Sequence, residues 1–125
     1  MKTKIYIIGN IPSKIDKECE DKFYKTQIHF LQMGFNVINP IARLTSKELT
    51  FNEAKRKNIH DLMLCSAVYI MPCVELIKGV ENLEIKLAND FNLVVISSMF
   101  DLNPEEKISS KNRKLLKKAN AIIDL

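Results

Sequence analysis

Short apolar runs alternate along this chain with longer segments whose apolar residues recur at helical spacing, and this alternation is the feature that most constrains the fold. The runs cover residues 4–8, 35–38, 67–71 and 93–96. Because they are rich in β-branched residues and nearly free of polar ones, each run is typical of a strand covered on both faces. Strict alternation of strand and helix predicts a parallel sheet, and right-handed crossovers make it an open, doubly wound α/β fold.

The first segment between strands, residues 16–33, is predicted to be a helix. One helical face is formed by side chains at i, i+4, i+7 and i+11, namely Cys19, Phe23, Thr26 and Phe30. Gly34 stands where a helix C-cap belongs. A second helix is expected from the capping box of Thr50 and Glu53 to about residue 64.

Three further elements complete the predicted order. Residues 79–91 are expected to form a helix, and residues 103–106 have the cap, proline and acidic side chains typical of another helix start. Residues 121–123 are a candidate fifth strand. Residues 41–49 and 73–78 are expected to be loops.

Composition narrows the class of protein. A length of 125 residues predicts one domain over residues 1–125, and a hydrophobic fraction of 46% excludes a disordered chain. No apolar run reaches the roughly 18 residues of a membrane span, and the N-terminal residues lack the features of a signal peptide. The 3 cysteines form no CxxC pair, so a reducing, cytoplasmic location is expected. His29 and His60 lack the spacing of zinc ligands, and neither a metal nor a cofactor is expected.

The C-terminal segment, residues 102–125, is predicted to be a basic helix followed by the possible last strand. From residue 101 onward it has six basic and four acidic side chains, so its net charge is only +2. No aromatic residue lies among the basic ones to stack on bases. A solvated helix face is therefore preferred over a nucleic-acid interface.

Ligands of doubly wound sheets bind at the carboxyl ends of the strands. Residues 9–13, 39–44 and 71–79 follow the first three strands and are expected to border that crevice. Gly9 and Asn10 can present backbone amides to a phosphate or sugar. A plain turn is equally well supported there, because the loop matches neither GxGxxG nor a P-loop.

The helix over residues 79–91 places an acid on its apolar side. Its predicted stripe consists of Val80, Leu83, Leu87 and Phe91. Glu84 lies about 40° from Val80 around the helix axis, within this stripe. A buried acid is costly unless it is paired or functional. Two interpretations remain: a carboxylate that reaches water or caps an amide at the edge of the core, and a carboxylate directed into a pocket.

Four stretches of the chain occur in a characteristic order: IYIIG at residues 5–9, GFNVINP at 34–40, CSAVYIMP at 65–72 and KGVENLEIKLA at 78–88. Over roughly residues 4–97 this ordered set resembles the nucleoside 2-deoxyribosyltransferase-like superfamily, and most closely a small bacterial and phage branch of it.

The resemblance implies a flavodoxin-like or Rossmann-like parallel sheet with strand order 2-1-3-4-5. It also implies a nucleoside or nucleotide ligand and a homodimer or higher homo-oligomer in which neighbouring subunits complete the pocket. Glu84, followed four residues later by Ala88, matches the nucleophile that attacks the anomeric carbon of deoxyribose. The candidate substrate-binding residues are Gly9, Asn10, Asn58, Gly79 and Glu81.

The chain departs from the family pattern at three usually polar or acidic positions, at Val74, where a Trp is usual, and by one extra residue between Gly79 and Glu84. Asn58 stands where an Asp of the second helix is usual, Ser66 where an Asp follows the cysteine, and Ile77 where a Ser or Asp precedes the glycine turn. Asn58 can form hydrogen bonds but cannot transfer a proton at neutral pH. Asp61, one helical turn away, can substitute only if its side chain faces the crevice.

Two functions follow from these residues. The first is an enzyme that cleaves or transfers the N-glycosidic bond of a nucleoside or nucleotide through Glu84. The second is a nucleotide-binding module of the same fold that has lost turnover, which the three replaced polar positions favour. A domain that binds nucleic acid or protein through the basic C-terminal helix ranks last.

Overall fold

The computed structural model describes residues 3–12, 14–72, 83–97 and 106–121. Within these ranges, four parallel strands form one sheet in the order β2-β1-β3-β4. The strands are β1 (Lys4–Ile8), β2 (Asn36–Ile38), β3 (Ala67–Ile70) and β4 (Val94–Ser97). This order and the parallel pairing confirm the predicted doubly wound α/β fold.

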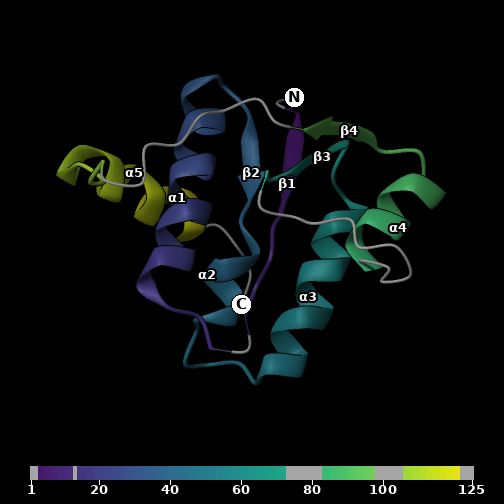
Figure 1. The fold of residues 1–125 in the computed structure, drawn as a ribbon, viewed down its shortest axis with the longest axis horizontal. Coiled ribbons are helices and arrows are strands. Elements are labelled where there is room, and N and C mark those ends of the chain that lie inside the picture. The colour runs from purple at the N-terminus through teal and green to yellow at the C-terminus, as the bar shows by residue number, and fades with distance from the viewer. Residues whose placement is uncertain (1–2, 13, 73–82, 98–105, 122–125) are drawn as a thin grey trace.

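Helices cover both faces of this sheet. They are α1 (Lys17–Gln32), α2 (Pro40–Leu44), α3 (Phe51–Met63), α4 (Leu83–Asp90) and α5 (Ser110–Ala121). In Figure 1, α1 and α5 lie on one side of the sheet and α3 and α4 on the other. The connections from β1 to β2 and from β3 to β4 join neighbouring strands, whereas the connection from β2 to β3 passes over β1, as the predicted order requires.

The predicted ends of α1 and α3 are confirmed by their caps. The Asp16 side chain accepts a hydrogen bond from the Cys19 amide at 2.8 Å, and Gly34 follows α1 with a φ of 93°. At the start of α3 the Glu53 amide donates to the Thr50 hydroxyl at 3.2 Å, and the Thr50 amide donates to the Glu53 carboxylate at 3.0 Å. These reciprocal bonds satisfy amides that a helix start otherwise leaves without partners.

The prediction that residues 41–49 are a loop is wrong over residues 41–44, which belong to α2. The Asn39 side chain accepts a hydrogen bond from the Ile41 amide at 3.0 Å, and Pro40 occupies the first helical turn. The Asn-Pro pair thus ends β2 and begins a helix at once. Proline suits that position, because the amide it lacks would have no partner inside the helix.

Two predictions for the C-terminal segment are also wrong within the described residues. Residues 106–109 are not helical, and α5 begins at Ser110, where the Ser109 hydroxyl accepts a hydrogen bond from the Asn112 amide at 3.2 Å. Ala121 is the last residue of α5 rather than the start of a strand. Residues 98–105 and 122–125 lie outside the described residues. The basic side chains of α5 are exposed, as predicted for a solvated face.

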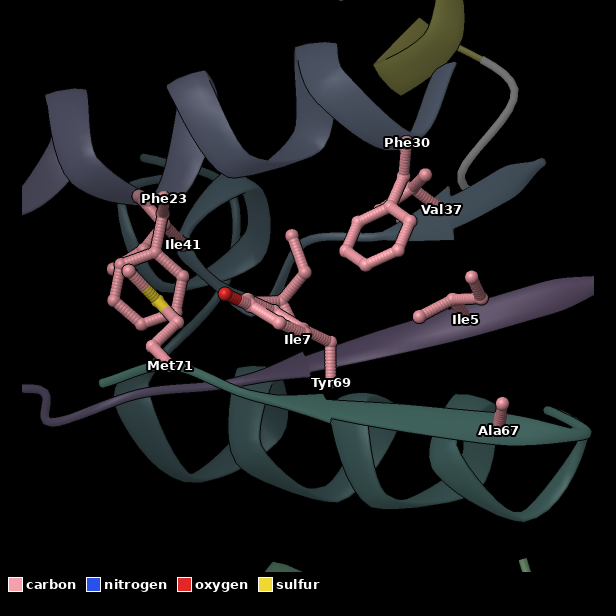
Figure 2. Close-up of a cluster of buried hydrophobic side chains, with 9 residues drawn as sticks. All are labelled: Ile5, Ile7, Phe23, Phe30, Val37, Ile41, Ala67, Tyr69 and Met71. Carbon is pink, nitrogen blue, oxygen red and sulfur yellow. The ribbon is translucent and has the colours of Figure 1, made fainter. Parts of the chain in front are cut away.

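The face of the sheet toward α1 carries a dry core. Figure 2 shows its nine buried side chains packed between α1 and the strands: Ile5, Ile7, Phe23, Phe30, Val37, Ile41, Ala67, Tyr69 and Met71. The rings of Phe30 and Tyr69 meet edge to face, with centroids 5.0 Å apart. Contacts of this kind add to the free energy gained by burying the rings.

The opposite face uses the alternate residues of the same strands. Tyr6 and Ile8 of β1 and Val68 of β3 pack there against Leu62 of α3 and Ala88 of α4. The predicted apolar stripe of α4 is wrong at two positions, because Leu83 is 58% exposed and Phe91, just after the helix, is 62% exposed. The small side chain of Ala88 is fully buried instead, which allows α4 to approach the sheet closely.

None of the helices in the described ranges is long and apolar enough to cross a lipid bilayer. The same ranges contain no cluster of three or more side chains that could hold a metal ion.

Candidate functional site

A cavity of about 360 Å³ lies where β1 ends, between the first turns of α3 and the beginning of α4. Four of the six predicted site residues line it: Gly9, Asn10, Asn58 and Glu84. The other two, Gly79 and Glu81, lie outside the described residues. The cavity occupies the carboxyl end of the sheet, which is the position that doubly wound folds use for ligands.

Glu84 lies in the first turn of α4 and is half-buried in this cavity. Its carboxylate is joined by a hydrogen bond to the hydroxyl of Tyr6, a residue of β1 that is 1% exposed. Burial raises the pKa of the Glu84 carboxyl, while the Tyr6 hydrogen bond and the Lys55 charge lower that pKa by a smaller amount. A titratable acid with opposing influences of this kind is typical of catalytic and binding sites.

Tyr6 faces the cavity because of its position in the strand. Ile5 and Ile7 point toward α1, so the residue between them points to the α3 and α4 side. Burial raises the pKa of the Tyr6 hydroxyl well above its usual value, and the neighbouring Glu84 carboxylate raises it further. Tyr6 therefore keeps its proton at neutral pH and donates it in the hydrogen bond to Glu84.

A second charged group borders the cavity on the α3 side. Lys55 lines it one turn after the helix start, with its Nζ 5.4 Å from the centroid of the Phe51 ring. The Phe51 ring also lines the cavity, and this residue is 54% exposed. A cation and an aromatic face at one opening can hold an anionic group and a planar group together.

Asn58 is buried in the wall of the cavity and is 4% exposed. Its amide nitrogen donates a hydrogen bond to the carbonyl oxygen of Pro40 at 3.2 Å, which holds the side chain in one orientation. Among the residues that the structure describes, its Oδ1 has no hydrogen-bond partner. A buried acceptor without a partner is costly in a purely structural role, so a role toward a ligand is the better explanation.

Gly9 is required at this site by packing. A Cβ atom there would lie 2.6 Å from Cζ of Phe23 and 2.7 Å from Sδ of Met71. Both side chains belong to the core beneath α1, so the strand end passes directly over that core. Glycine lets the backbone come this close while its other side borders the cavity.

The structure also places the residues that depart from the family pattern. Asp61 forms an ion pair with Arg43 and lines a different cavity, so it does not substitute for an acid at Asn58. Ser66 is exposed just before β3, at the amino end of that strand. Neither side chain lines the Glu84 cavity, and Ile77 lies outside the described residues.

Three residues of the site were not predicted from the sequence: Tyr6, Phe51 and Lys55. The strand parity of β1 was a usable signal for Tyr6, because Ile5 and Ile7 occupy one face of the strand and the residue between them must lie on the other. Phe51 and Lys55 looked like ordinary residues of a helix start. Their relation to Glu84 depends on how α3 packs beside α4, which no local pattern reports.

No protein-family model, no curated protein and no solved structure matches this chain. The residues of the cavity and the order of the four sequence stretches are therefore what indicate a function for this chain.

Proposed function

We propose that this chain binds a nucleoside or nucleotide in the Glu84 cavity and cleaves or transfers its N-glycosidic bond. The observation that carries the proposal is the half-buried Glu84 carboxylate, hydrogen-bonded to Tyr6 inside a cavity at the carboxyl end of the sheet. A volume of about 360 Å³ lies within the range of roughly 300–1,000 Å³ typical of small-molecule sites.

In this proposal a Glu84 oxygen attacks the anomeric carbon and forms a glycosyl ester as the carbon–nitrogen bond breaks. The electron pair of that bond leaves with the base, which takes up a proton from water. Water or a second base then attacks the same carbon and releases the Glu84 carboxylate. Tyr6 is a positioning residue, because its hydroxyl orients the carboxylate and favours the ionised form that the attack needs.

The cavity offers partners for both parts of a nucleotide. Lys55 is the one positively charged side chain among the described residues that line it, and its ammonium group suits a phosphate. The exposed ring of Phe51 suits a base, since aromatic rings stack on planar groups. Gly9, Asn10 and Asn58 remain for the sugar, and we include Gly79 and Glu81 among the proposed substrate contacts from the resemblance.

A nucleotide-binding module without turnover is the second candidate, and one observation favours it. Glu84 is the only carboxylate among the described residues that line the cavity. Asn58 holds the position of a second acid and cannot protonate a leaving base. If no other acid protonates the leaving base, the protein binds the nucleotide without cleaving it.

We further propose that the chain forms a homodimer or higher homo-oligomer in the cytoplasm. β4 is an edge strand of the described sheet and exposes Val94 and Val95, and Phe91 is exposed shortly before it. Apolar side chains gathered at a sheet edge are typical of an interface. The cytoplasmic location is proposed from the sequence, whose 3 cysteines form no CxxC pair.

The test is release of free base from a panel of nucleosides and nucleoside monophosphates, followed by chromatography. We expect the wild type and the exposed control Glu48→Gln to release base, and Glu84→Gln to release none. Release that survives in Glu84→Gln, or is absent from all three, contradicts the enzyme.

The binding module is then tested by thermal unfolding in the presence of the same compounds. A ligand at about 100 times its dissociation constant adds roughly 2.7 kcal/mol to the free energy of unfolding. A rise in melting temperature that is lost in Phe51→Ala and Lys55→Gln supports binding at this cavity. A panel without any such rise contradicts both functions.

A further inference from the structure

One peptide group at the start of α2, between Pro40 and Ile41, forms hydrogen bonds on both of its sides. Its N–H donates to Oδ1 of Asn39 at 3.0 Å, and its carbonyl oxygen accepts from Nδ2 of Asn58 at 3.2 Å. A trans peptide group is planar, and its N–H and C=O point in opposite directions. Because α2 lies between α1 and α3 (Figure 1), this rigid unit joins a side chain at the end of β2 to one in the wall of the Glu84 cavity.

Asn39 is held in turn by two further amide side chains. Its Nδ2 donates to Oε1 of Gln27 at 3.1 Å, and Nε2 of Gln27 donates to Oδ1 of Asn120 at 2.9 Å. Asn39 and Gln27 are 1% and 0% exposed, and Asn120 is half-buried. A chain of three amides therefore leads from α5 through α1 to the first turn of α2.

A backbone donor sets the direction of every amide in this chain. The Ile41 N–H can only donate, so Asn39 turns its oxygen toward it and its nitrogen toward Gln27. Gln27 must then offer its oxygen to Asn39, which leaves its nitrogen for the oxygen of Asn120. Reversing any one of these amides would place donor against donor or acceptor against acceptor, so the chain has one arrangement.

A backbone acceptor sets the direction of Asn58 in the same way. The Pro40 carbonyl can only accept, so Asn58 turns its nitrogen toward it and its Oδ1 away. That Oδ1 is buried and has no hydrogen-bond partner among the described residues, and both Asn58 and Pro40 line the cavity. The orientation of the peptide group thus determines where this acceptor lies.

Helix capping alone explains only part of the arrangement. A cap needs an acceptor at position 39 for the Ile41 amide, and a Ser or Asp there would serve equally. It needs no buried glutamine behind it, and burying such a side chain costs conformational entropy and desolvation that its two hydrogen bonds must offset. What Gln27 adds is a single orientation of the capping residue and of the peptide group that this residue holds.

We propose that Gln27 and Asn39 are positioning residues of the Glu84 cavity. They fix the peptide group between residues 40 and 41, and this group fixes the direction in which Asn58 offers its Oδ1 to a ligand. Asn120 extends this role to α5, a helix that contacts α1 although none of its described residues lines the cavity. The positioning is a property of the protein without ligand, and only its use in binding rests on the proposed function.

The first experiment is NMR spectroscopy of the full, isotopically labelled chain, which needs no ligand. Gln27→Met replaces the amide by an apolar side chain of similar length and leaves Nδ2 of Asn39 without its acceptor. We expect the side-chain amide signals of Asn58 to move. We also expect the Ile41 amide hydrogen to exchange about tenfold faster or more, relative to the amides of β1.

The matched control is Thr26→Val. Thr26 is the neighbour of Gln27 in α1, is 1% exposed, and donates its hydroxyl to the Lys22 carbonyl within the helix. This variant should leave both NMR signals in place. Asn120→Ala tests the same chain from its half-buried end if Gln27→Met does not fold, and should cause a smaller change of the same kind. Asn120→Asp keeps the acceptor and should retain the wild-type signals.

The second experiment is calorimetric titration with deoxyadenosine and with deoxyadenosine monophosphate. Gln27→Met and Asn58→Ala should each weaken binding about fivefold or more. If Gln27 acts through Asn58, the double variant should bind no more weakly than Asn58→Ala alone. Thr26→Val should change the affinity by less than about twofold.

Unchanged signals of Asn58 and Ile41 in both Gln27→Met and Asn120→Ala, or equal changes in Thr26→Val, overturn the positioning. Additive losses of affinity in the double variant also overturn it, because Gln27 would then act independently of Asn58. If the signals move as expected but the wild type binds neither compound, the positioning stands and the proposed function is contradicted.

Discussion

The two faces of the sheet differ although the same strands build them. Toward α1, Ile5 and Ile7 join a core in which the apolar side chains are closely packed (Figure 2). Toward α3 and α4, the alternate residue Tyr6 meets an acid, and the packing opens into a cavity. The difference indicates that the face toward α1 mainly stabilises the fold. The face toward α3 and α4 is less closely packed at its carboxyl end, where it forms a polar site.

Buried polar groups show the same contrast. Near α1, the Asn39 amide donates to Gln27 at 3.1 Å and the Gln27 amide donates to Asn120 at 2.9 Å, so α1, α2 and α5 are tied by satisfied hydrogen bonds. Across the sheet, the pKa of Glu84 is raised and Oδ1 of Asn58 has no partner among the described residues. Satisfied networks stabilise a fold, and unsatisfied ones are the better candidates for function.

The largest expected effect is on the α1 face. Phe30→Ala removes a fully buried ring and should lower the free energy of unfolding by about 3–5 kcal/mol, measured by urea denaturation. Phe51→Ala removes an exposed ring from the other face and should cost less than about 1 kcal/mol. Equal losses for the two variants would contradict the division between the faces.

Gly9→Ala tests the point where the two faces meet. The added methyl group must displace Phe23 or Met71, so we expect a loss of about 1–3 kcal/mol in the same denaturation experiment. Ligand binding at the Glu84 cavity should weaken as well, because the displaced strand end borders it. A variant as stable as the wild type would show that Phe23 and Met71 can move aside without loss of packing.

Tyr6→Phe removes the hydroxyl that bonds to Glu84 and keeps the ring. We expect a stability loss of about 1–2 kcal/mol at neutral pH and a further rise in the pKa of Glu84, because one influence that lowers this pKa is gone. The acidic limb of a pH–activity or pH–binding profile should then move to higher pH. Tyr24→Phe, a half-buried tyrosine of α1, is the matched control and should leave that limb in place.

The smallest expected effect is the pH dependence of stability that Glu84 causes. Because its pKa is raised in the folded state, the native chain holds the proton more tightly than the unfolded chain, whose carboxyl has a usual pKa of 4.5. Its contribution to stability is therefore fully present below that value and is lost as pH rises through the folded pKa. Glu84→Gln should gain stability relative to wild type over this window, on the order of 1 kcal/mol or less.

Glu53 offers the control of opposite sign. Hydrogen bonds from Thr50 hold the pKa of the Glu53 carboxyl below its usual value. Its contribution is therefore present above the unfolded pKa and is lost as pH falls, so Glu53→Gln should lose stability relative to wild type at neutral pH. The measurement is the free energy of unfolding of wild type and both variants from about pH 3 to pH 8. If the wild type and Glu84→Gln show the same pH dependence, the pKa of Glu84 is not raised in the folded state.

The local sequence alone determined the order of strands and helices, the capping box at Thr50 and the glycine that ends α1. Each is set by neighbours within a few residues, so a local pattern in the sequence is enough to predict it. The local pattern gave a wrong prediction after Asn39-Pro40, where one pair both ends a strand and begins a helix. It was also wrong in the C-terminal segment, where Ser109 rather than Asn103 precedes the described helix.

The tertiary structure decided what surrounds each candidate residue. Whether Asp61 faces the crevice, which donor meets Glu84 and where Lys55 lies depend on the packing of α3 against α4 and α2. A pattern along the chain reports which side of a helix is apolar, but the rotation of that helix against its neighbours is set by side chains distant in the sequence. Ala88 illustrates this, since its small size lets α4 turn Glu84 toward Tyr6 while leaving Leu83 in solvent.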